Sequence, residues 1–166
     1  TGPLTDTGVP ETGRHQVIFK SPLTGIFAQS SVGGSWGINL KRSGFDGIII
    51  KGKADKPLYI WIHEGEIEFK DAKHLWGKDT FETEDALKSE HGKNIEIACI
   101  GPAGERLSLI SAVMNNKGRA AARSGVGAIM GSKKLKAFIE RNRCFGCGQC
   151  VVGCDAQAAR MIPARA

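Results

Sequence analysis

The sequence contains no apolar run long enough to cross a bilayer, and its amino end does not read as a secretory signal. These absences exclude an ordinary membrane-spanning helix from the interpretation. The five cysteines are then expected to be reduced thiols in a cytoplasmic protein, in an anaerobic setting. At 166 residues and 41% hydrophobic content, the chain can form one domain with a real core, or one domain plus a small appendage.

Acidic residues are scarce in the last third of the chain. Between residues 117 and 143 a single acid, Glu140, stands against eight basic residues: Lys117, Arg119, Arg123, Lys133, Lys134, Lys136, Arg141 and Arg143. Such an imbalance predicts an anionic partner, such as phosphates, nucleic acid or an acidic redox protein. For residues 133–136 we favour a solvated basic face. A zinc-stabilised nucleic-acid binder ranks low, because the stretch lacks aromatic residues interleaved for base stacking.

Four of the five cysteines lie within eleven residues, Cys144, Cys147, Cys150 and Cys154, with the spacing C-x2-C-x2-C-x3-C. This is the spacing of bacterial-type ferredoxins, whose thiolates hold iron–sulfur clusters. Zinc is the competing interpretation, although zinc sites usually pair two knuckles across a longer spacer. Disulfides between such close neighbours would be strained. We therefore predict that the four cysteines bind a 4Fe-4S cluster.

The fourth ligand of that cluster remains open. In a two-cluster ferredoxin the fourth cysteine serves the other cluster, and this chain has no second run. All four cysteines on one cluster, or three with a thiolate from a partner chain, are the alternatives. Cys99 lies in an apolar stretch that predicts a buried strand, where a free cysteine is usually a small hydrophobe. The proline that usually follows such a run is replaced by Asp155.

Hydrophobic patterning predicts alternating strands and helices. We expect strands at 15–20, 46–52, 58–63, 66–70, 94–100 and 107–114, with a hairpin joining the third and fourth, and helices at 38–44 and 80–91. Residues 26–37 are expected to form a loop whose small side chains suit close approach to a ligand. Thr80 is the expected helix cap. His63, next to the hairpin turn, is expected to lie at the surface.

A stretch of small residues surrounds two arginines, Arg119 and Arg123. Small side chains allow a bulky ligand to press against the backbone, and arginines bind phosphate or ring oxygens in a bidentate manner. Packing of a helix by alanine and glycine, with the arginines merely exposed, explains the pattern equally well.

Several ordered motifs together resemble one known family over residues 2–138. They are Gly2–Thr5, Gly13-Arg14, Lys20–Gly25, Gly33-Gly34, Lys51–Ala54, Leu75–Lys78, Ile100–Glu105 and Arg119 through Lys136. This part resembles the N-terminal cofactor-binding domain of the tungsten-containing aldehyde:ferredoxin oxidoreductases. The resemblance implies an α+β fold with a mixed β-sheet, in which residues 1–138 form the base under a pterin cofactor. Residues 139–166 would form a ferredoxin-like Fe-S segment, packed directly on the edge of the domain because the linker is short.

The resemblance also implies a cofactor, a tungsten (or molybdenum) bis-pyranopterin. The residue matching Arg14 would lie between the iron–sulfur cluster and the pterin. Gly33, Arg119 and Arg123 would lie along the pterin surface. A magnesium ion would bridge the pterin phosphates, bound by the backbone carbonyl of Ala120 and by an asparagine that this chain replaces with Ser31.

Two further departures accompany Ser31, because two glycines of the family pattern appear here as Ala122 and Ser124. The implied reaction is the oxidation of an aldehyde to a carboxylate, with electrons leaving through an iron–sulfur cluster to ferredoxin. We assign no catalytic residue, since the chain offers no recognisable acid–base pair or substrate cavity, and we expect a catalytic partner subunit or a longer parent chain. The alternative is a non-catalytic electron-transfer subunit with a vestigial pterin surface. We expect neither membrane nor nucleic-acid partners.

Overall fold

A computed structural model describes residues 1–63, 65–141 and, for the backbone alone, 159–163. The cysteine run at 144–154 lies outside the described residues. Within the described chain, no helix is both long and apolar enough to span a membrane.

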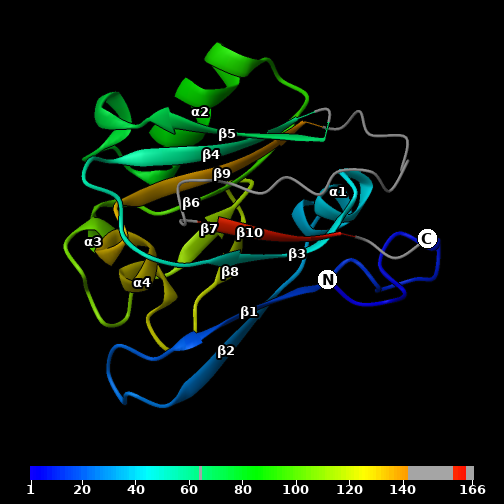
Figure 1. Cartoon of the computed structure of the whole chain (residues 1–166), viewed down its shortest axis with the longest axis horizontal. Coiled ribbons are helices and arrows are strands. Elements are labelled where there is room, and N and C mark those ends of the chain that lie inside the picture. Colours follow the sequence, from blue (N-terminus) through cyan, green and yellow to red (C-terminus); the bar gives the residue numbers. More distant parts are fainter. Residues whose placement is uncertain (64, 142–158, 164–166) are drawn as a thin grey trace.

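The centre of the fold is a mixed six-stranded sheet with the order β5-β4-β9-β6-β7-β8 (Figure 1). Its strands are β4 (Leu58–His63), β5 (Glu66–Asp71), β6 (Ile95–Cys99), β7 (Val113–Asn115), β8 (Arg119–Ala121) and β9 (Leu135–Arg141). β4 and β9 run parallel, and the other neighbours in this sheet are antiparallel. The predicted α+β class and mixed sheet are thereby confirmed.

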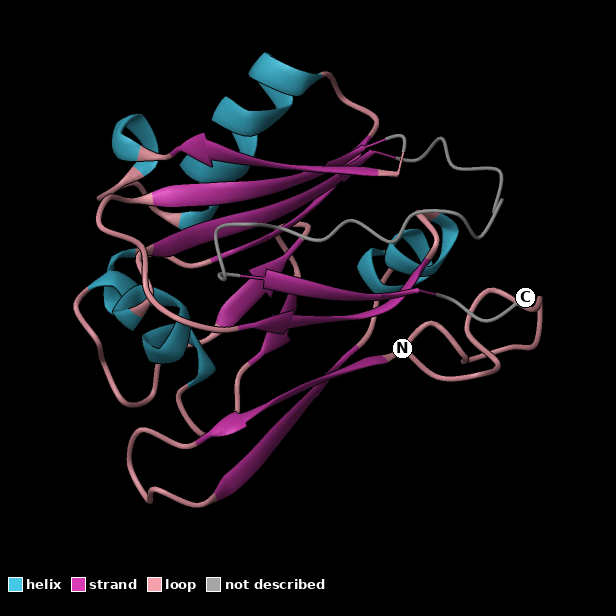
Figure 2. Ribbon diagram, viewed as in Figure 1, coloured by secondary structure: helices cyan, strands magenta, loops and turns pink. Residues whose placement is uncertain are grey.

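Helices cover both faces of this sheet (Figure 2). On one face, α2 (Thr80–His91) and the 3-10 turn η1 (Lys73–Leu75) bury Leu75 and Leu87 against β6 and β9. On the other face lie α1 (Trp36–Arg42) and α4 (Val126–Ser132). α4 packs so closely on α3 (Pro102–Glu105) that a Cβ atom on Gly131 would lie 2.0 Å from the Gly104 carbonyl oxygen. The glycine is therefore required by backbone contact.

Two pairs of strands form a second layer beside α1 and α4. β1 (His15–Lys20) and β2 (Phe27–Val32) make an antiparallel hairpin, and β3 (Phe45–Ile50) pairs antiparallel with β10 (Ala159–Pro163). The pairing of β10 with β3 agrees with the expectation that the tail packs on the edge of the domain. β9 extends through Arg141, beyond the predicted domain boundary at residue 138.

The predicted hairpin at residues 58–70 is confirmed as β4 and β5, and the helix at 80–91 as α2. The cap of α2 is Asp79, however, and not Thr80. The Asp79 carboxylate accepts a hydrogen bond from the Glu82 N–H, and the Glu82 side chain accepts one from the Asp79 N–H. A carboxylate that satisfies a free helical N–H is a stronger cap than the following threonine.

Two other predictions were wrong in part. The strand expected at 107–114 is only the three residues of β7, because Leu107 takes a positive φ of 60° and the backbone at 108–112 turns to meet the start of α4. Half of the loop expected at 26–37 is strand β2, whose hydroxyl-bearing residues pair with β1, and its last two residues begin α1. The small polar side chains of this segment did not predict a strand, because its extended conformation depends on the hydrogen bonds to β1.

Lys136 corrects the expectation of a solvated basic face at 133–136. Its side chain is fully buried, and its ammonium lies 2.5 Å from a carboxylate oxygen of Glu105 and 2.8 Å from the Lys78 carbonyl oxygen. A buried lysine needs such partners because an isolated charge is costly to remove from water. Its neighbours fit the prediction better: Lys133 and Lys134 form exposed hydrogen bonds to loop carbonyls.

Candidate functional site

Arg14 and Ser31 are the first pair of predicted site residues that the fold brings together. Arg14 immediately precedes β1, and Ser31 lies on β2 opposite Gln16. The Arg14 guanidinium donates from Nε to the Ser31 hydroxyl at 3.0 Å and from Nη2 to the Ser31 carbonyl at 3.4 Å. These bonds hold an exposed arginine in a defined position at the end of the hairpin.

Gly33 and Gly34 bring the end of β2 close to both Arg14 and Arg119. A Cβ atom on Gly33 would lie 3.6 Å from Nη1 of Arg14, and one on Gly34 would lie 3.2 Å from Cγ of Arg119. Gly34 also has a φ of +100°, a conformation that side chains with a Cβ rarely adopt. The sequence singled out Gly33 as a site residue, whereas in the structure Gly34 is the position where a side chain would be less well tolerated.

Arg119 and Ala120 lie on β8, and Arg123 follows that strand. β8 lies beside β2, and the Arg123 N–H donates to the Ser30 hydroxyl at 3.2 Å. Residues 14–34 and 119–124, about a hundred positions apart, therefore share one surface. We call it the arginine surface and define it by Arg14, Ser31, Gly33, Gly34, Arg119, Ala120, Ala122, Arg123 and Ser124.

In residues 1–63 and 65–141, no acidic side chain neutralises the charge on the arginine surface. Arg14, Arg119 and Arg123 are exposed, and within the described chain none of them forms an ion pair. Other surface cations do: Lys117 pairs with Asp85 and Arg42 with Asp6. Three guanidinium groups without acidic partners, beside exposed glycine and alanine, suit a flat anionic ligand that needs several bidentate contacts. The residues present therefore fit the phosphate-bearing pterin that the resemblance implies.

The magnesium position fits less well. The Ser31 hydroxyl already accepts a hydrogen bond from Arg14, and a cation lies beside it. Mg²⁺ requires oxygen ligands and is repelled by a neighbouring guanidinium. A role for Ser31 and the Ala120 carbonyl as magnesium ligands stays a prediction, and the serine is better placed to orient Arg14.

Cys99 does not behave as a metal ligand in the described structure. It is 1% exposed, and burial raises its pKa to about 12. Its thiol donates weakly to the Thr80 carbonyl oxygen at 3.7 Å. Because thiolate is the form that binds metals, this setting supports the expectation of a small buried hydrophobe. The structure does not place the predicted ligands Cys144, Cys147, Cys150 and Cys154, which lie outside the described residues.

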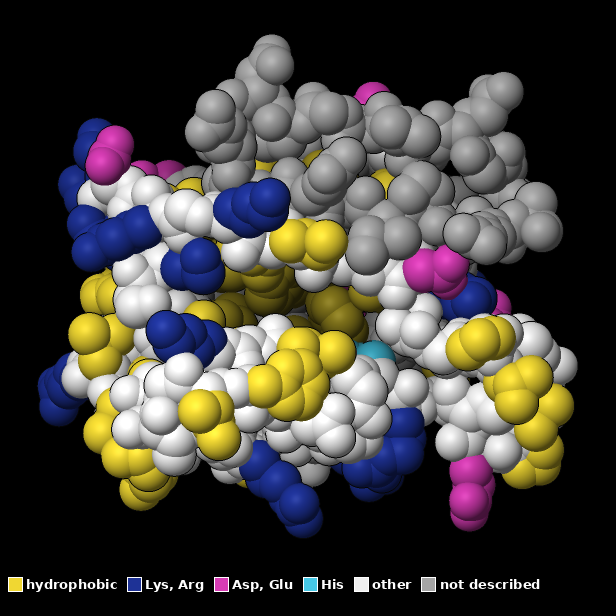
Figure 3. Space-filling view, turned by 60° about the horizontal axis from the view of Figure 1, so that its bottom comes forward, with side chains coloured by type: hydrophobic (Ala, Val, Ile, Leu, Met, Phe, Trp, Pro, Cys, Tyr) yellow, Lys and Arg dark blue, Asp and Glu magenta, His cyan; other side chains and the backbone are white. Residues whose placement is uncertain are grey.

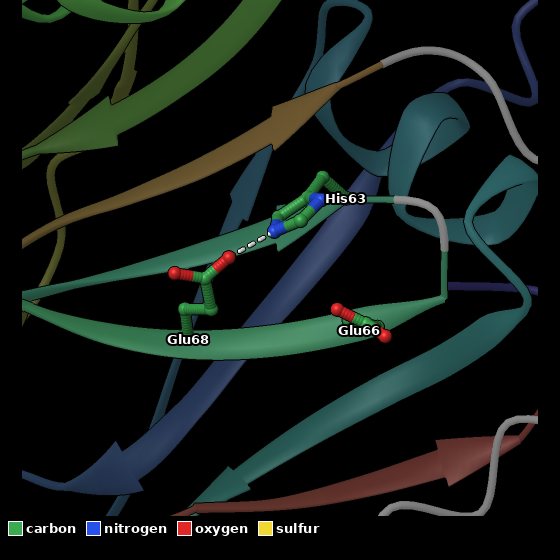
Figure 4. Close-up of side chains that lie close together, drawn as sticks. All are labelled: His63, Glu66 and Glu68. Carbon is green, nitrogen blue, oxygen red and sulfur yellow. Dashed lines mark hydrogen bonds and ion pairs between the residues drawn. The ribbon is translucent and has the colours of Figure 1, made fainter.

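One other group of potential ligands lies on the β4–β5 hairpin, where His63, Glu66 and Glu68 have ligand atoms within 4.8 Å of one another (Figure 4). His63 bonds to Glu68, which also pairs with Lys70 at 3.2 Å. These contacts lower the pKa of Glu68, with the His63 hydrogen bond as the main cause. Because His63 and Lys70 already engage the Glu68 carboxylate, we assign the cluster no metal. His63 is 19% exposed, less than the sequence suggested.

Two carboxylates on the central sheet, the partly buried Glu96 and the fully buried Glu140, were not found from the sequence. Glu96 accepts hydrogen bonds from Ser35 at 2.8 Å and from Asn116, which links β6 to the start of α1. Opposite Glu96, Glu140 on β9 is fully buried, and neither carboxylate oxygen has a hydrogen-bond partner in the described chain. Burial, followed by the Glu96 charge, raises the Glu140 pKa well above its usual value. The available signal was a carboxylate beside apolar residues: Glu96 between Ile95 and Ile97, and Glu140 after Phe138 and Ile139.

Comparison with known proteins gives a consistent result. Residues 1–142 match the family model "Aldehyde ferredoxin oxidoreductase, N-terminal domain". The chain is 56% identical over 142 residues to the tungsten-containing aldehyde ferredoxin oxidoreductase of Pyrococcus abyssi, which covers 85% of this chain. It is 36% identical over 154 residues, again 85% of this chain, to a Pyrococcus furiosus protein named aliphatic sulfonate oxidoreductase, WOR-like subunit.

A solved structure shares both the fold and part of the sequence. The active site complex BamBC of benzoyl coenzyme A reductase, in complex with 1,5 dienoyl-CoA, aligns with a TM-score of 0.77 and 37% identity over 80% of this chain and 20% of that chain. The chain spans less than a quarter of the two relatives named above, 23% and 24% of their lengths. The similar proteins are thus longer chains or members of multi-subunit assemblies.

Proposed function

Because the chain belongs to the aldehyde ferredoxin oxidoreductase family, we propose that its N-terminal part is the pterin-binding base of a tungsten oxidoreductase. The observation that carries the proposal is the arginine surface, where Arg14, Arg119 and Arg123 are exposed and, among the residues that the structure describes, have no acidic partner. Arg119 and Arg123 would bind the anionic groups of a tungsten (or molybdenum) bis-pyranopterin. Gly33 and Gly34 would allow its rings to approach the backbone.

When bound, the metal-pterin would supply the redox chemistry, the two-electron oxidation of an aldehyde to a carboxylate. The residues of this chain would bind and orient the cofactor and compensate its negative charge. Arg14, fixed by Ser31, would stand at the edge of the cofactor that faces the cluster. No acid–base pair is evident on the arginine surface, so the groups that handle the substrate would come from a longer parent chain or a partner subunit.

The cysteines of the tail complete the proposed electron path. Cys144, Cys147, Cys150 and Cys154 would bind a 4Fe-4S cluster, and electrons would leave through it to ferredoxin. The antiparallel pairing of β10 with β3 brings the polypeptide that follows these cysteines back onto the domain. This return supports a cluster near the edge of the domain.

A second candidate function is that of an iron–sulfur electron carrier whose pterin surface is vestigial. The engagement of Ser31 by Arg14 favours it, because the family's magnesium ligand at this position is an asparagine. Ala122 and Ser124 favour it as well, since both add bulk beside Arg123 where the family pattern has glycine.

Metal analysis of the anaerobically purified protein distinguishes the candidates. We expect tungsten or molybdenum together with about four irons and four sulfides per chain. The double variant Arg119→Ala/Arg123→Ala should lose most of the tungsten and retain the iron. Lys51→Ala, which removes an exposed cation outside the arginine surface, is the matched control. Iron and sulfide without tungsten in the parent protein would establish the electron carrier, and zinc would refute both candidates.

A further inference from the structure

Two connecting segments carry residues of the arginine surface. Gly34 lies between β2 and α1, and Arg119 begins β8 directly after the turn that follows β7. A Cβ atom on Gly34 would lie only 3.2 Å from Cγ of Arg119, so the two segments are in contact. The position of Arg119 therefore depends on what holds these two segments together.

Glu96 on β6 is hydrogen-bonded to both segments. Ser35, which follows Gly34, donates from its hydroxyl to Oε2 of Glu96 at 2.8 Å, and the side-chain amide of Asn116 donates to the same oxygen. The Asn116 amide also donates to the Ser35 hydroxyl at 3.2 Å. Hydrogen bonds to a carboxylate are stronger than those between neutral groups. One side chain of the central sheet thus joins the two segments, and we call Glu96, Ser35 and Asn116 the Glu96 network.

Ser35 does not have the role that its position predicts. It is the N-cap residue of α1, where a serine side chain normally accepts a hydrogen bond from a backbone N–H of the first helical turn. Within the described chain its side chain forms no capping bond. The hydroxyl instead accepts from Asn116 and donates to Glu96. The segment that contains Gly34 is therefore fixed to the central sheet at this point.

The turn before Arg119 is held in an uncommon conformation. Asn116 has a φ of 47° and Lys117 a φ of 57°, in the left-handed region that few residues other than glycine adopt. The Asn116 side chain accepts from the Ile97 N–H at 3.1 Å, and the Asn116 N–H donates to the Ile97 carbonyl at 3.1 Å. Lys117 pairs with Asp85 of α2. Side-chain contacts with both β6 and α2 therefore fix the turn from which Arg119 projects.

The Glu96 network is separate from the largest hollow of the described structure. An apolar groove of about 470 Å³ lies between β1 and β3, and Figure 3 shows hydrophobic side chains at its bottom. Glu96, Ser35 and Asn116 do not line it. Their hydrogen bonds are thus directed at the segments of the arginine surface and not at the groove.

We propose that Glu96 is a positioning residue of the arginine surface, which holds Gly34 and Arg119 in the arrangement that receives an anionic group of the ligand. The inference rests on the proposed function, because it requires this surface to bind an anion. Without Glu96, the Ser35 hydroxyl and the Asn116 amide would lose their shared acceptor, and Arg119 would follow a less constrained turn. A less preorganised site binds more weakly, because the ordering of its segments then opposes binding.

The test is a calorimetric titration of the 166-residue protein with inorganic pyrophosphate, after production without tungstate or molybdate. Glu96→Leu should raise the dissociation constant about tenfold. Glu96→Gln keeps an oxygen acceptor at the same place and should restore most of the affinity. Asn116→Gly should reproduce the loss, because glycine tolerates the positive φ of the turn but lacks the amide. Glu140→Gln is the matched control, since it alters the residue opposite Glu96 on β9, and should leave the affinity unchanged.

A second titration series distinguishes positioning from a general loss of structure. In the Arg119→Ala variant, the further change Glu96→Leu should not weaken binding, because Glu96 acts through Arg119. All variants should keep the circular dichroism spectrum of the parent, and Ser35→Ala replaces Glu96→Leu if that variant does not fold.

Two results would overturn the positioning role and leave the binding role of the arginine surface intact. One is that Glu96→Leu binds pyrophosphate as tightly as the parent, and the other is that its effect persists undiminished beside Arg119→Ala. A parent protein that does not bind pyrophosphate would overturn both roles.

Discussion

Two sets of basic side chains lie within twenty residues of each other and behave in opposite ways. Arg119 and Arg123 are exposed and have no acidic partner in the described chain, whereas Lys136 is fully buried against Glu105. Both sets belong to the same basic stretch of sequence. Basic residues that are close in sequence therefore have different roles in the structure. The buried Lys136 stabilises the fold, and the exposed Arg119 and Arg123 are available to a ligand.

The largest effect is expected from removing the buried cation. Lys136→Met would leave the Glu105 carboxylate buried without its partner and should lower the free energy of unfolding by about 3–5 kcal/mol. Urea denaturation measures this loss. Lys133→Met, which removes a partly exposed lysine three residues away, should change stability by less than about 0.5 kcal/mol. Equal effects of the two substitutions would show that the Lys136–Glu105 pair has no special structural role.

Acid should destabilise the protein through His15, a basic group held neutral by burial. Burial, with smaller contributions from the terminal amine and Arg14, lowers the pKa of His15 to about 4. As the pH falls below about 6.5, His15 becomes protonated in the unfolded chain but stays neutral in the folded protein until the pH is near 4. The free energy of unfolding therefore has its full value above pH 6.5 and decreases as the pH falls toward 4. The loss should be about 3 kcal/mol.

Unfolding curves measured between pH 4 and 7 test this expectation against the variant His15→Phe, which keeps an aromatic ring beside Trp36. The variant should show a shallower decline. A decline of unchanged slope would assign the effect to other groups, of which His91 is the first to examine because burial lowers its pKa to about 4 as well.

Glu140 should have the opposite pH dependence. Its raised pKa means that the folded protein keeps a proton that the unfolded chain releases above pH 4.5, so its contribution to stability is lost as the pH rises. Glu140→Gln should therefore raise the melting temperature at pH 7 and leave it nearly unchanged at pH 4. An equal change at both pH values would point to packing and not to ionisation.

The smallest effect on stability is expected at the arginine surface. Arg119→Ala/Arg123→Ala removes two exposed cations that form no ion pair with any described residue, and should change the free energy of unfolding by less than about 0.5 kcal/mol. The same variant should lose most of its bound tungsten. A large loss of stability would mean that these arginines belong to the scaffold, as Lys136 does, and would remove the main support for a cofactor surface.

Much of the fold was predictable because local signals agree with the tertiary structure. The hairpin of β4 and β5, the helix α2 and the strand that buries Cys99 follow from hydrophobic patterning and turn residues. β2 and the segment before β7 were not predictable in the same way. β2 forms only because β1 supplies its hydrogen bonds, and residues 107–112 follow the packing of α4 and not their own apolar pattern.

The sequence by itself determined the family and the mixed α+β class, because its ordered motifs can be recognised residue by residue along the chain. Only the tertiary structure decided which charges are free and which are buried. In the folded protein Arg14 donates hydrogen bonds to Ser31, and Gly34 lies against Arg119. The buried Lys136 pairs with Glu105, and an apolar groove lies between β1 and β3. Burial and pairing depend on contacts between residues 17 (Arg14 and Ser31), 31 (Glu105 and Lys136) or about 85 (Gly34 and Arg119) positions apart, and no local pattern predicts them.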